Sequence, residues 1–136
     1  MSLEWHGEQL KRATKVAAKL GVDQTTTAAV RAAKNRLQPG HGYQFGVLKR
    51  SVQSRAAREI APNVIGGLWG SFDVAYAIYV ETGTAPHWIG APVKIKGVGW
   101  RFIGLHPGTQ PIPYLRVSAD EEYPKLAGRI QKALAT

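Results

Sequence analysis

Four histidines are the side chains in this sequence with the widest range of possible chemistry. His6, His41, His87 and His106 each stand beside Gly, Pro or Trp in loop-like sequence. No two of them have the i, i+4 spacing of a helical metal site, and no cluster of Asp and Glu accompanies them. His87 and His106 are expected to face each other across the base of a hairpin, in a structural role. We expect no metal site and no cofactor.

The acidic side chains give no catalytic constellation either. Glu81 follows an apolar block, where an acid commonly pairs with an arginine or caps backbone amides. Glu121 and Glu122 fit the first turn of a helix. Gly97-Val-Gly99 lacks the βαβ setting of a dinucleotide site, and the sequence has no phosphate-binding P-loop and no Gly-x-Ser-x-Gly elbow. We therefore expect a protein that is not an enzyme.

A basic, aromatic hairpin over residues 92–103 is the strongest binding signal. Val93 and Ile95 alternate with lysines, Gly97-Val-Gly99 supplies the turn, and aromatic residues alternate with an arginine afterwards. The alternation predicts one basic face and one apolar face. Such a hairpin can stack on bases and contact phosphates, or insert into a neighbouring subunit as an arm. We favour the arm, and the predicted interface residues are Trp88, Lys94, Lys96, Trp100, Arg101 and Phe102.

Length and composition set the class of protein. A chain of 136 residues with 44% apolar residues is long enough for one folded domain with a modest core. Its net charge of +9 favours an anionic neighbour, and the excess of basic residues lies in the first 60 residues. The basic surface there is either a solvated face or a nucleic-acid stripe. Without cysteine there is no disulfide framework. No apolar run is long enough to span a bilayer, so we expect no membrane association.

The pattern predicts two N-terminal helices, with Gly21 ending the first and Asp23 capping the second. Both are rich in alanine and should dock closely on a sheet. Residues 46–52 should lead from a loop into a strand that runs to about residue 60, and a second strand over 64–69 should pair with it antiparallel. Residues 56–59 would also tolerate helix, and Gly66-Gly67 indicates a bulge or a close backbone approach.

The central stretch Tyr76-Ala-Ile-Tyr-Val-Glu-Thr-Gly-Thr84 is the most apolar short block of the chain. A short helix capped by Asp73 is expected there, although a strand would also suit the residues. Gly83 should end it at positive φ, with Tyr76, Ile78 and Val80 largely buried. After a connector with three prolines, Ser118 should cap the final helix in a capping box with Glu121. The expected fold is α+β in a single domain over residues 1–136. Residues 1–38 are helical, 43–116 form a small antiparallel sheet with the short helix and the projecting hairpin, and 117–136 are the C-terminal helix.

Four signals in a fixed order resemble one family. They are Gly46-Val-Leu-Lys-Arg-Ser-Val52, then the central stretch followed by Pro86-His87, then the basic hairpin, then His106-Pro-Gly-Thr-Gln-Pro-Ile-Pro-Tyr-Leu-Arg116 before an acidic-started helix. Over residues 10–134 this is similar to the siphophage neck and tail-completion proteins, also described as minor tail, head–tail joining or tail-terminator proteins. The motif residues are Tyr76, Ile78, Val80, Glu81, Gly83, His106, Pro107, Gly108, Pro113, Tyr114 and Leu115.

The resemblance implies a structural virion protein assembled in the host cytoplasm. Such a protein forms a ring, usually of six subunits, at the head–tail interface. The ring ends the tail tube and joins it to the head connector, while DNA passes through the centre. The chain departs from the family in residues 38–45, where the family tends to have an Ala-Pro-Val-Asp-Thr-Gly type of loop. The alternative class is a free, basic nucleic-acid-binding module.

Overall fold

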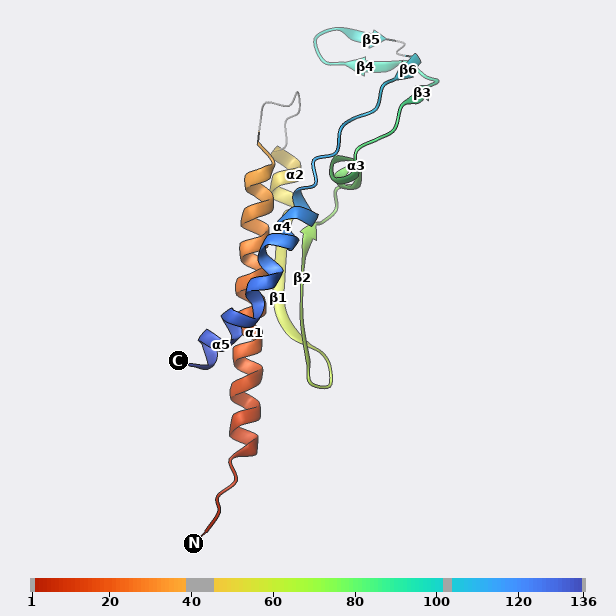
Figure 1. Ribbon diagram of the computed structural model, residues 1–136. Helices are drawn as coiled ribbons and strands as arrows, with labels where there is room; N and C mark the ends of the chain where they lie inside the picture. Colours follow the sequence, from red (N-terminus) through yellow and green to blue (C-terminus); the bar gives the residue numbers. More distant parts are fainter. Residues whose placement is uncertain (1, 39–45, 102–103, 136) are drawn as a thin grey trace. The chain divides into compact units, whose positions relative to one another are not determined.

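The computed structural model describes residues 2–38, 46–101 and 104–135, and its chain forms two compact units (Figure 1). The helical unit comprises residues 1–74 and 114–136, and the ribbon unit comprises residues 75–113. The fold mixes helices with small antiparallel sheets on which the terminal helices pack, as the α+β prediction requires. Within the described residues the strands form three separate two-stranded sheets, and the predicted hairpin is one of them.

One long helix, α1 (Gly7–Arg36), replaces the two helices that the sequence predicts. Gly21 lies inside it and is buried against α5 (Leu126–Leu134). A Cβ at this position would fall 2.5 Å from Cγ1 of Ile130, so only glycine allows this close approach. An interior glycine costs a helix about 1 kcal/mol relative to alanine. The close approach of α5 offsets that cost, so the helix continues where local sequence predicts a stop.

Asp23 serves a strand and not a helix end. The strands β1 (Val52–Ala61) and β2 (Val64–Ser71) pair antiparallel, and the register shifts between Arg55 and Arg58. Two residues of β1 there oppose one residue of β2, which leaves a backbone amide outside the ladder. The Asp23 carboxylate accepts this amide, the N–H of Ala57, at 2.7 Å. The bulge was predicted within Gly66-Gly67 and lies instead in β1, opposite Gly67. The predicted N-cap is wrong because the carboxylate has a long-range partner.

The sheet packs on α1 through its glycines. A Cβ on Gly67 would fall 2.7 Å from Cγ1 of Val22 and 3.1 Å from Cγ2 of Thr26, which confirms the predicted close approach. Before β1, the short helix α2 (Gly46–Ser51) occupies residues that we predicted to lead into the strand. Its Leu48 is fully buried, so the turn brings an apolar side chain into the core.

The C-terminal helix begins at Tyr114, three residues before the predicted start at residue 117, and is broken in the middle. Helix α4 (Tyr114–Glu122) is followed by the 3-10 turn η1 (Tyr123–Lys125), which contains Pro124, and then by α5. Ser118 is buried inside α4 and is no cap. Its hydroxyl donates to the Tyr114 carbonyl oxygen at 2.5 Å and accepts from the Arg36 guanidinium at 2.9 Å.

The core of the helical unit is small and built around α1. Among the described residues, the fully or nearly fully buried apolar side chains are Ala17, Ala29, Ala33, Leu37, Leu48, Val52 and Tyr114. The Tyr114 hydroxyl is satisfied at 2.8 Å by that of Ser71 at the end of β2. Alanines on α1 let β1, β2, α4 and α5 approach closely, as the alanine-rich sequence predicts.

The ribbon unit contains one short helix and two β-ribbons. Helix α3 (Ala77–Thr82) is followed by β3 (His87–Ile89), which pairs with β6 (Gly104–His106). Between them β4 (Val93–Ile95) and β5 (Gly99–Arg101) form the predicted hairpin. Gly83 ends α3 at φ 72°, as expected, but Tyr76 and not Asp73 is the N-terminal flanking residue, and no side chain caps it.

The predicted burial of the central stretch is wrong. Ile78 is 61% exposed, Tyr76 is 46% exposed and Val80 is only half-buried. A helix of six residues makes fewer than two turns, so it can cover little apolar surface of its own. The apolar residues of α3 are therefore available for contacts outside the core.

Candidate interaction surface

Two of the sequence signals, the central stretch and the segment from His106 to Arg116, contact each other at one place. We call this contact the clasp and define it as Gly83, Thr84, Gly108 and Thr109. Thr84 and Thr109 exchange backbone hydrogen bonds of 3.1 and 3.0 Å in an isolated antiparallel bridge. The Thr109 amide also reaches the Thr84 hydroxyl at 3.0 Å, and the two hydroxyls lie 3.1 Å apart. The clasp therefore ties the segment after α3 to the segment after β6.

Glycine is required at positions 83 and 108 of the clasp. Gly83 and Gly108 have φ of 72° and 82°. A Cβ on Gly83 would lie 2.6 Å from the Thr109 carbonyl oxygen, and one on Gly108 would overlap the Thr84 carbonyl oxygen and lie 2.9 Å from the Ala85 carbonyl carbon. These neighbours are backbone atoms, which cannot rotate away. Gly83-Thr84 and Gly108-Thr109 thus form the two sides of one close contact between backbone segments.

The predicted facing of His87 and His106 is confirmed just beyond the clasp. The two residues are directly opposite in the β3–β6 register, with ring centroids 5.0 Å apart. The Gly108 amide donates to Nδ1 of His106 at 3.0 Å, and Nδ1 of His87 lies 2.8 Å from the Ala85 carbonyl oxygen. Because a carbonyl only accepts, Nδ1 of His87 carries a proton, whereas Nδ1 of His106 does not. Both imidazoles therefore act in fixing local backbone.

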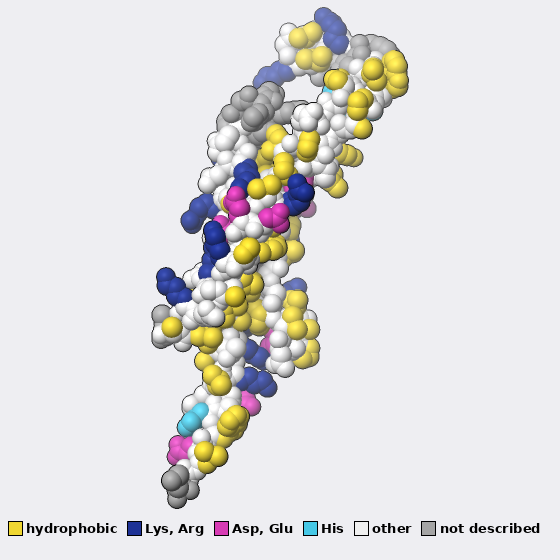
Figure 2. All heavy atoms as spheres, viewed as in Figure 1, with side chains coloured by type: hydrophobic (Ala, Val, Ile, Leu, Met, Phe, Trp, Pro, Cys, Tyr) yellow, Lys and Arg dark blue, Asp and Glu magenta, His cyan; other side chains and the backbone are white. Residues whose placement is uncertain are grey.

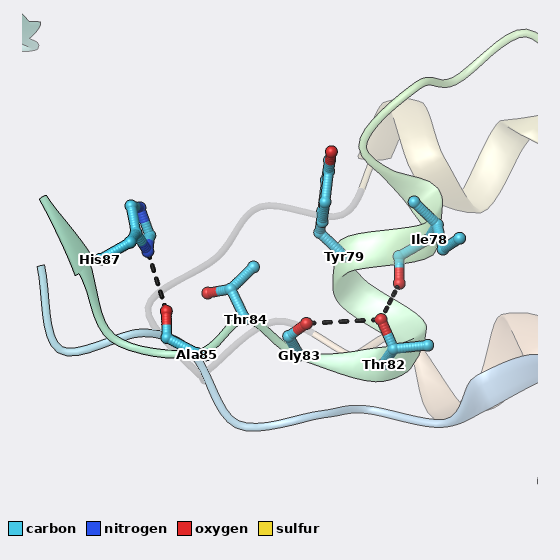
Figure 3. Close-up of a pocket in the computed structure, with 7 residues that line it drawn as sticks. All are labelled: Ile78, Tyr79, Thr82, Gly83, Thr84, Ala85 and His87. Carbon is cyan, nitrogen blue, oxygen red and sulfur yellow. Dashed lines mark hydrogen bonds between the residues drawn. The ribbon is translucent and has the colours of Figure 1, made fainter. Parts of the chain in front are cut away.

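A shallow hollow of about 640 Å³ lies along the segment from α3 to β3 (Figure 3). It is bordered by Ile78, Tyr79, Thr82, Gly83, Thr84, Ala85 and His87. The Thr82 hydroxyl turns back to the Ile78 carbonyl oxygen at 2.7 Å, and the Tyr79 ring stands away from it (Figure 3). The Thr82 and Thr84 hydroxyls bond to nearby backbone groups, and the hollow offers a surface for packing.

The arm, which we define as strands β3–β6 of the ribbon unit, exposes large apolar side chains. Trp88 is 76% exposed and lies opposite Leu105 on the same face of the β3–β6 ribbon, and Leu105 is 55% exposed. Trp100, on β5, is 65% exposed. Hydrophobic side chains gather on this unit in the face that Figure 2 shows. Exposed aromatic groups of this size mark interaction sites more often than free surface.

The predicted division of the hairpin into a basic and an apolar face is wrong. The register pairs Lys94 with Trp100 and Val93 with Arg101. Directly opposed residues project on the same face of a sheet, so a basic and an apolar residue share each face. Phe102, the remaining predicted interface residue, lies outside the described residues. Lys96 is exposed in the turn.

The remaining motif residues have structural positions. Glu81 is half-buried in the last turn of α3. Tyr114 belongs to the core of the helical unit, and Leu115 beside it in α4 is half-buried. Pro107 and Pro113 flank the connector, in which the Ile112 amide donates to the Val80 carbonyl oxygen at 2.8 Å. The clasp threonines were missed as functional positions, although the repeated Gly-Thr pair was a visible signal.

Ion pairs join several charged side chains of the helical unit, although its basic residues outnumber its acids. In the helical unit Arg36 pairs with Glu121, Lys15 with Glu59, and Arg129 and Lys125 with Glu122. The hydrogen bond from Arg129 lowers the pKa of Glu122 below 4.5, and the Asn63 amide together with Lys15 lowers that of Glu59. The arm has three basic residues and, over residues 86–106, no acid.

The part of the chain that the structure describes contains neither a metal-ion site nor a membrane-spanning helix. Within these residues no three His, Asp or Glu side chains come together in a way that could hold a metal ion. None of the described helices combines the length and the apolar character needed to cross a membrane.

Comparison with known proteins adds no relative. Neither family models, nor curated proteins, nor solved structures match this chain.

Proposed function

We propose that the chain is a structural assembly subunit of a tailed bacteriophage, of the neck and tail-completion class. Subunits join head to tail into a ring, with six as the expected copy number. The ring completes the tail tube, joins it to the head connector and lets DNA pass through. The proposal combines the sequence resemblance with the chemistry of the arm.

The observation that carries the proposal is the exposure of Trp88 and Trp100 on ribbons of three-residue strands. An isolated two-stranded ribbon is marginally stable in water, and it gains stability when its apolar side chains are covered. Buried Trp residues also contribute more than most side chains to protein interfaces. The arm therefore has the properties of an element that is completed by a partner subunit.

The clasp supports the same function. Two of the four signals that carry the resemblance, the central stretch and the segment from His106 to Arg116, bond directly to each other at Thr84 and Thr109, which lie 25 positions apart. Their residues hold the base of the arm and contribute no reactive group. A mechanical role explains the Gly-Thr pair that both motifs contain.

The test is electron microscopy of the purified protein, alone and with tail tubes, combined with sedimentation velocity over a range of concentrations. The proposal predicts closed rings, either free or at the end of a tube. Protein that stays monomeric at high concentration and never joins tail tubes would overturn it.

The second candidate function is a free nucleic-acid-binding module, which the net charge of +9 and the pairing of Trp100 with Lys94 favour. A base can stack on an exposed indole while a lysine contacts its phosphate. This function predicts a monomer whose DNA affinity falls steeply with salt concentration. A titration at several salt concentrations separates the two functions.

A further inference from the structure

The arm has two exposed anchors whose surroundings favour a protein partner over DNA. Trp88 shares its face of the β3–β6 ribbon with Leu105, an apolar neighbour. On the β4–β5 ribbon, Lys94 and Arg101 lie on opposite faces. Contact with a DNA backbone is strengthened by positive charges that meet it together, and strands β4 and β5 place their two basic residues apart. Apolar anchors with charges around them are typical of a protein interface.

A partner for the arm should combine acidic and large apolar side chains. Four of the described acids, Asp23, Glu59, Glu121 and Glu122, already have a basic partner or a backbone amide. The stretch of residues 2–10 differs. It carries Glu4 and Glu8 and no Lys or Arg, so its charge is −2 against +3 for Lys94, Lys96 and Arg101 of the arm.

The same N-terminal stretch exposes its apolar side chains. Leu3 is 97% exposed and Trp5 is 87% exposed. Trp5 turns back over Gly7, where an added Cβ would overlap the indole ring, and with Leu10 it borders an apolar hollow of about 420 Å³. Glu4 has only a histidine, His6, at 3.5 Å, and Glu8 lies in the first turn of α1.

We infer that residues 2–10 of one subunit bind the arm of the next subunit. The inference rests on the proposed assembly function and names its contact. Glu4 and Glu8 would face the basic residues of the neighbour's arm, while Leu3, Trp5 and Leu10 would cover its tryptophans. The two patches differ, as a head-to-tail contact requires, so each subunit can use both and the chain of contacts can close.

Charge reversal on each side tests the contact. The double variants E4K/E8K and K94E/K96E are made in the full chain, and self-association is measured by sedimentation velocity. Each variant alone should raise the dissociation constant at least about tenfold, because like charges then face each other across the interface. Mixed in equal amounts, the two variants should recover association to within about threefold of wild type, since each arm then meets a segment of opposite charge.

Matched controls exclude general effects of charge. Asp120→Lys changes an exposed acid on α4, and Lys132→Glu changes an exposed base on α5. Both controls should associate like wild type, and circular dichroism should show every variant folded. The cysteine-free sequence also allows a direct readout. Copies with Ser2→Cys mixed with copies with Ala91→Cys should cross-link to a heterodimer with a short bis-maleimide.

The outcomes separate the inference from the proposed function. If wild type assembles and E4K/E8K assembles equally well, the inference is wrong and the assembly function stands. If wild type does not self-associate at any concentration, the assembly function fails first. If K94E/K96E assembles normally but loses binding to a short DNA duplex, the arm faces DNA, and the inferred contact is overturned.

Discussion

Replacement of Gly108 by alanine should open the clasp while the helical unit stays folded. The residue has φ 82°, and a Cβ there would overlap the carbonyl oxygen of Thr84. A left-handed conformation costs a non-glycine residue about 1–2 kcal/mol. Relief of the overlap requires the strands to separate, which removes the two backbone hydrogen bonds between Thr84 and Thr109, at about 1 kcal/mol each. The sum is about 3–4 kcal/mol, confined to the ribbon unit.

Gly97 provides a matched control in the same unit. It has φ 81°, and no atom lies within 4 Å of the position that its Cβ would occupy. Gly97→Ala should therefore cost only the conformational part, about 1–2 kcal/mol. Comparison of the two variants isolates the contribution of the close backbone crossing.

Amide hydrogen exchange measures the effect where it occurs. In Gly108→Ala the amides of Thr84 and Thr109 should exchange at least about thirtyfold faster than in Gly97→Ala, which corresponds to about 2 kcal/mol. Amides of the β1–β2 ladder should exchange equally in both variants. Equal exchange at Thr84 and Thr109 in the two variants would refute the argument that backbone overlap makes Gly108 necessary.

Three further predictions concern the helical unit. Gly21→Ala should destabilise the protein by about 1–2 kcal/mol in equilibrium unfolding, because overpacking against Ile130 exceeds the gain in helix propensity. As a control, Gly128→Ala, with open space around it, should stabilise α5 by up to about 1 kcal/mol. A stabilising Gly21→Ala would contradict the close packing. Tyr114→Phe should cost about 1 kcal/mol by the same measurement, since the Ser71 hydroxyl loses its partner, and an unchanged unfolding midpoint would show the bond to be dispensable. The lowered pKa of Glu122 stabilises the folded state fully above pH 4.5, and this contribution is lost as the pH falls through the folded-state pKa. Unfolding curves of Glu122→Gln should therefore lose less stability in acid than those of the wild type. An identical pH dependence of the two proteins would refute the role of Arg129.

Local signals in the sequence were sufficient for the turns and the ribbons. Ala61-Pro-Asn63 joins β1 to β2, and Gly97-Val-Gly99 joins β4 to β5, as predicted. The left-handed Gly83 follows from its place directly after the apolar block, and the facing of His87 with His106 follows from their places on either side of the hairpin.

The faces of the hairpin required the register. Ile95 pairs with Gly99, so three residues lie in the loop. An odd number of loop residues pairs positions of the same parity, which puts Lys94 beside Trp100. A loop of even length would have given the separate basic and apolar faces that the alternation within each strand predicted. The sequence contains the alternation but does not state the pairing.

The helix boundaries depended on partners far away in the chain. Gly21, Asp23 and Ser118 all carry strong local signals for a helix end, each with an energy of about 1 kcal/mol. In the structure Gly21 packs against Ile130, Asp23 accepts a hydrogen bond from the Ala57 amide, and Ser118 accepts one from Arg36. The sequence by itself determined which residues have capping or close-packing chemistry. Tertiary structure decided where that chemistry is used, because packing and hydrogen bonds between distant segments exceed the local preference.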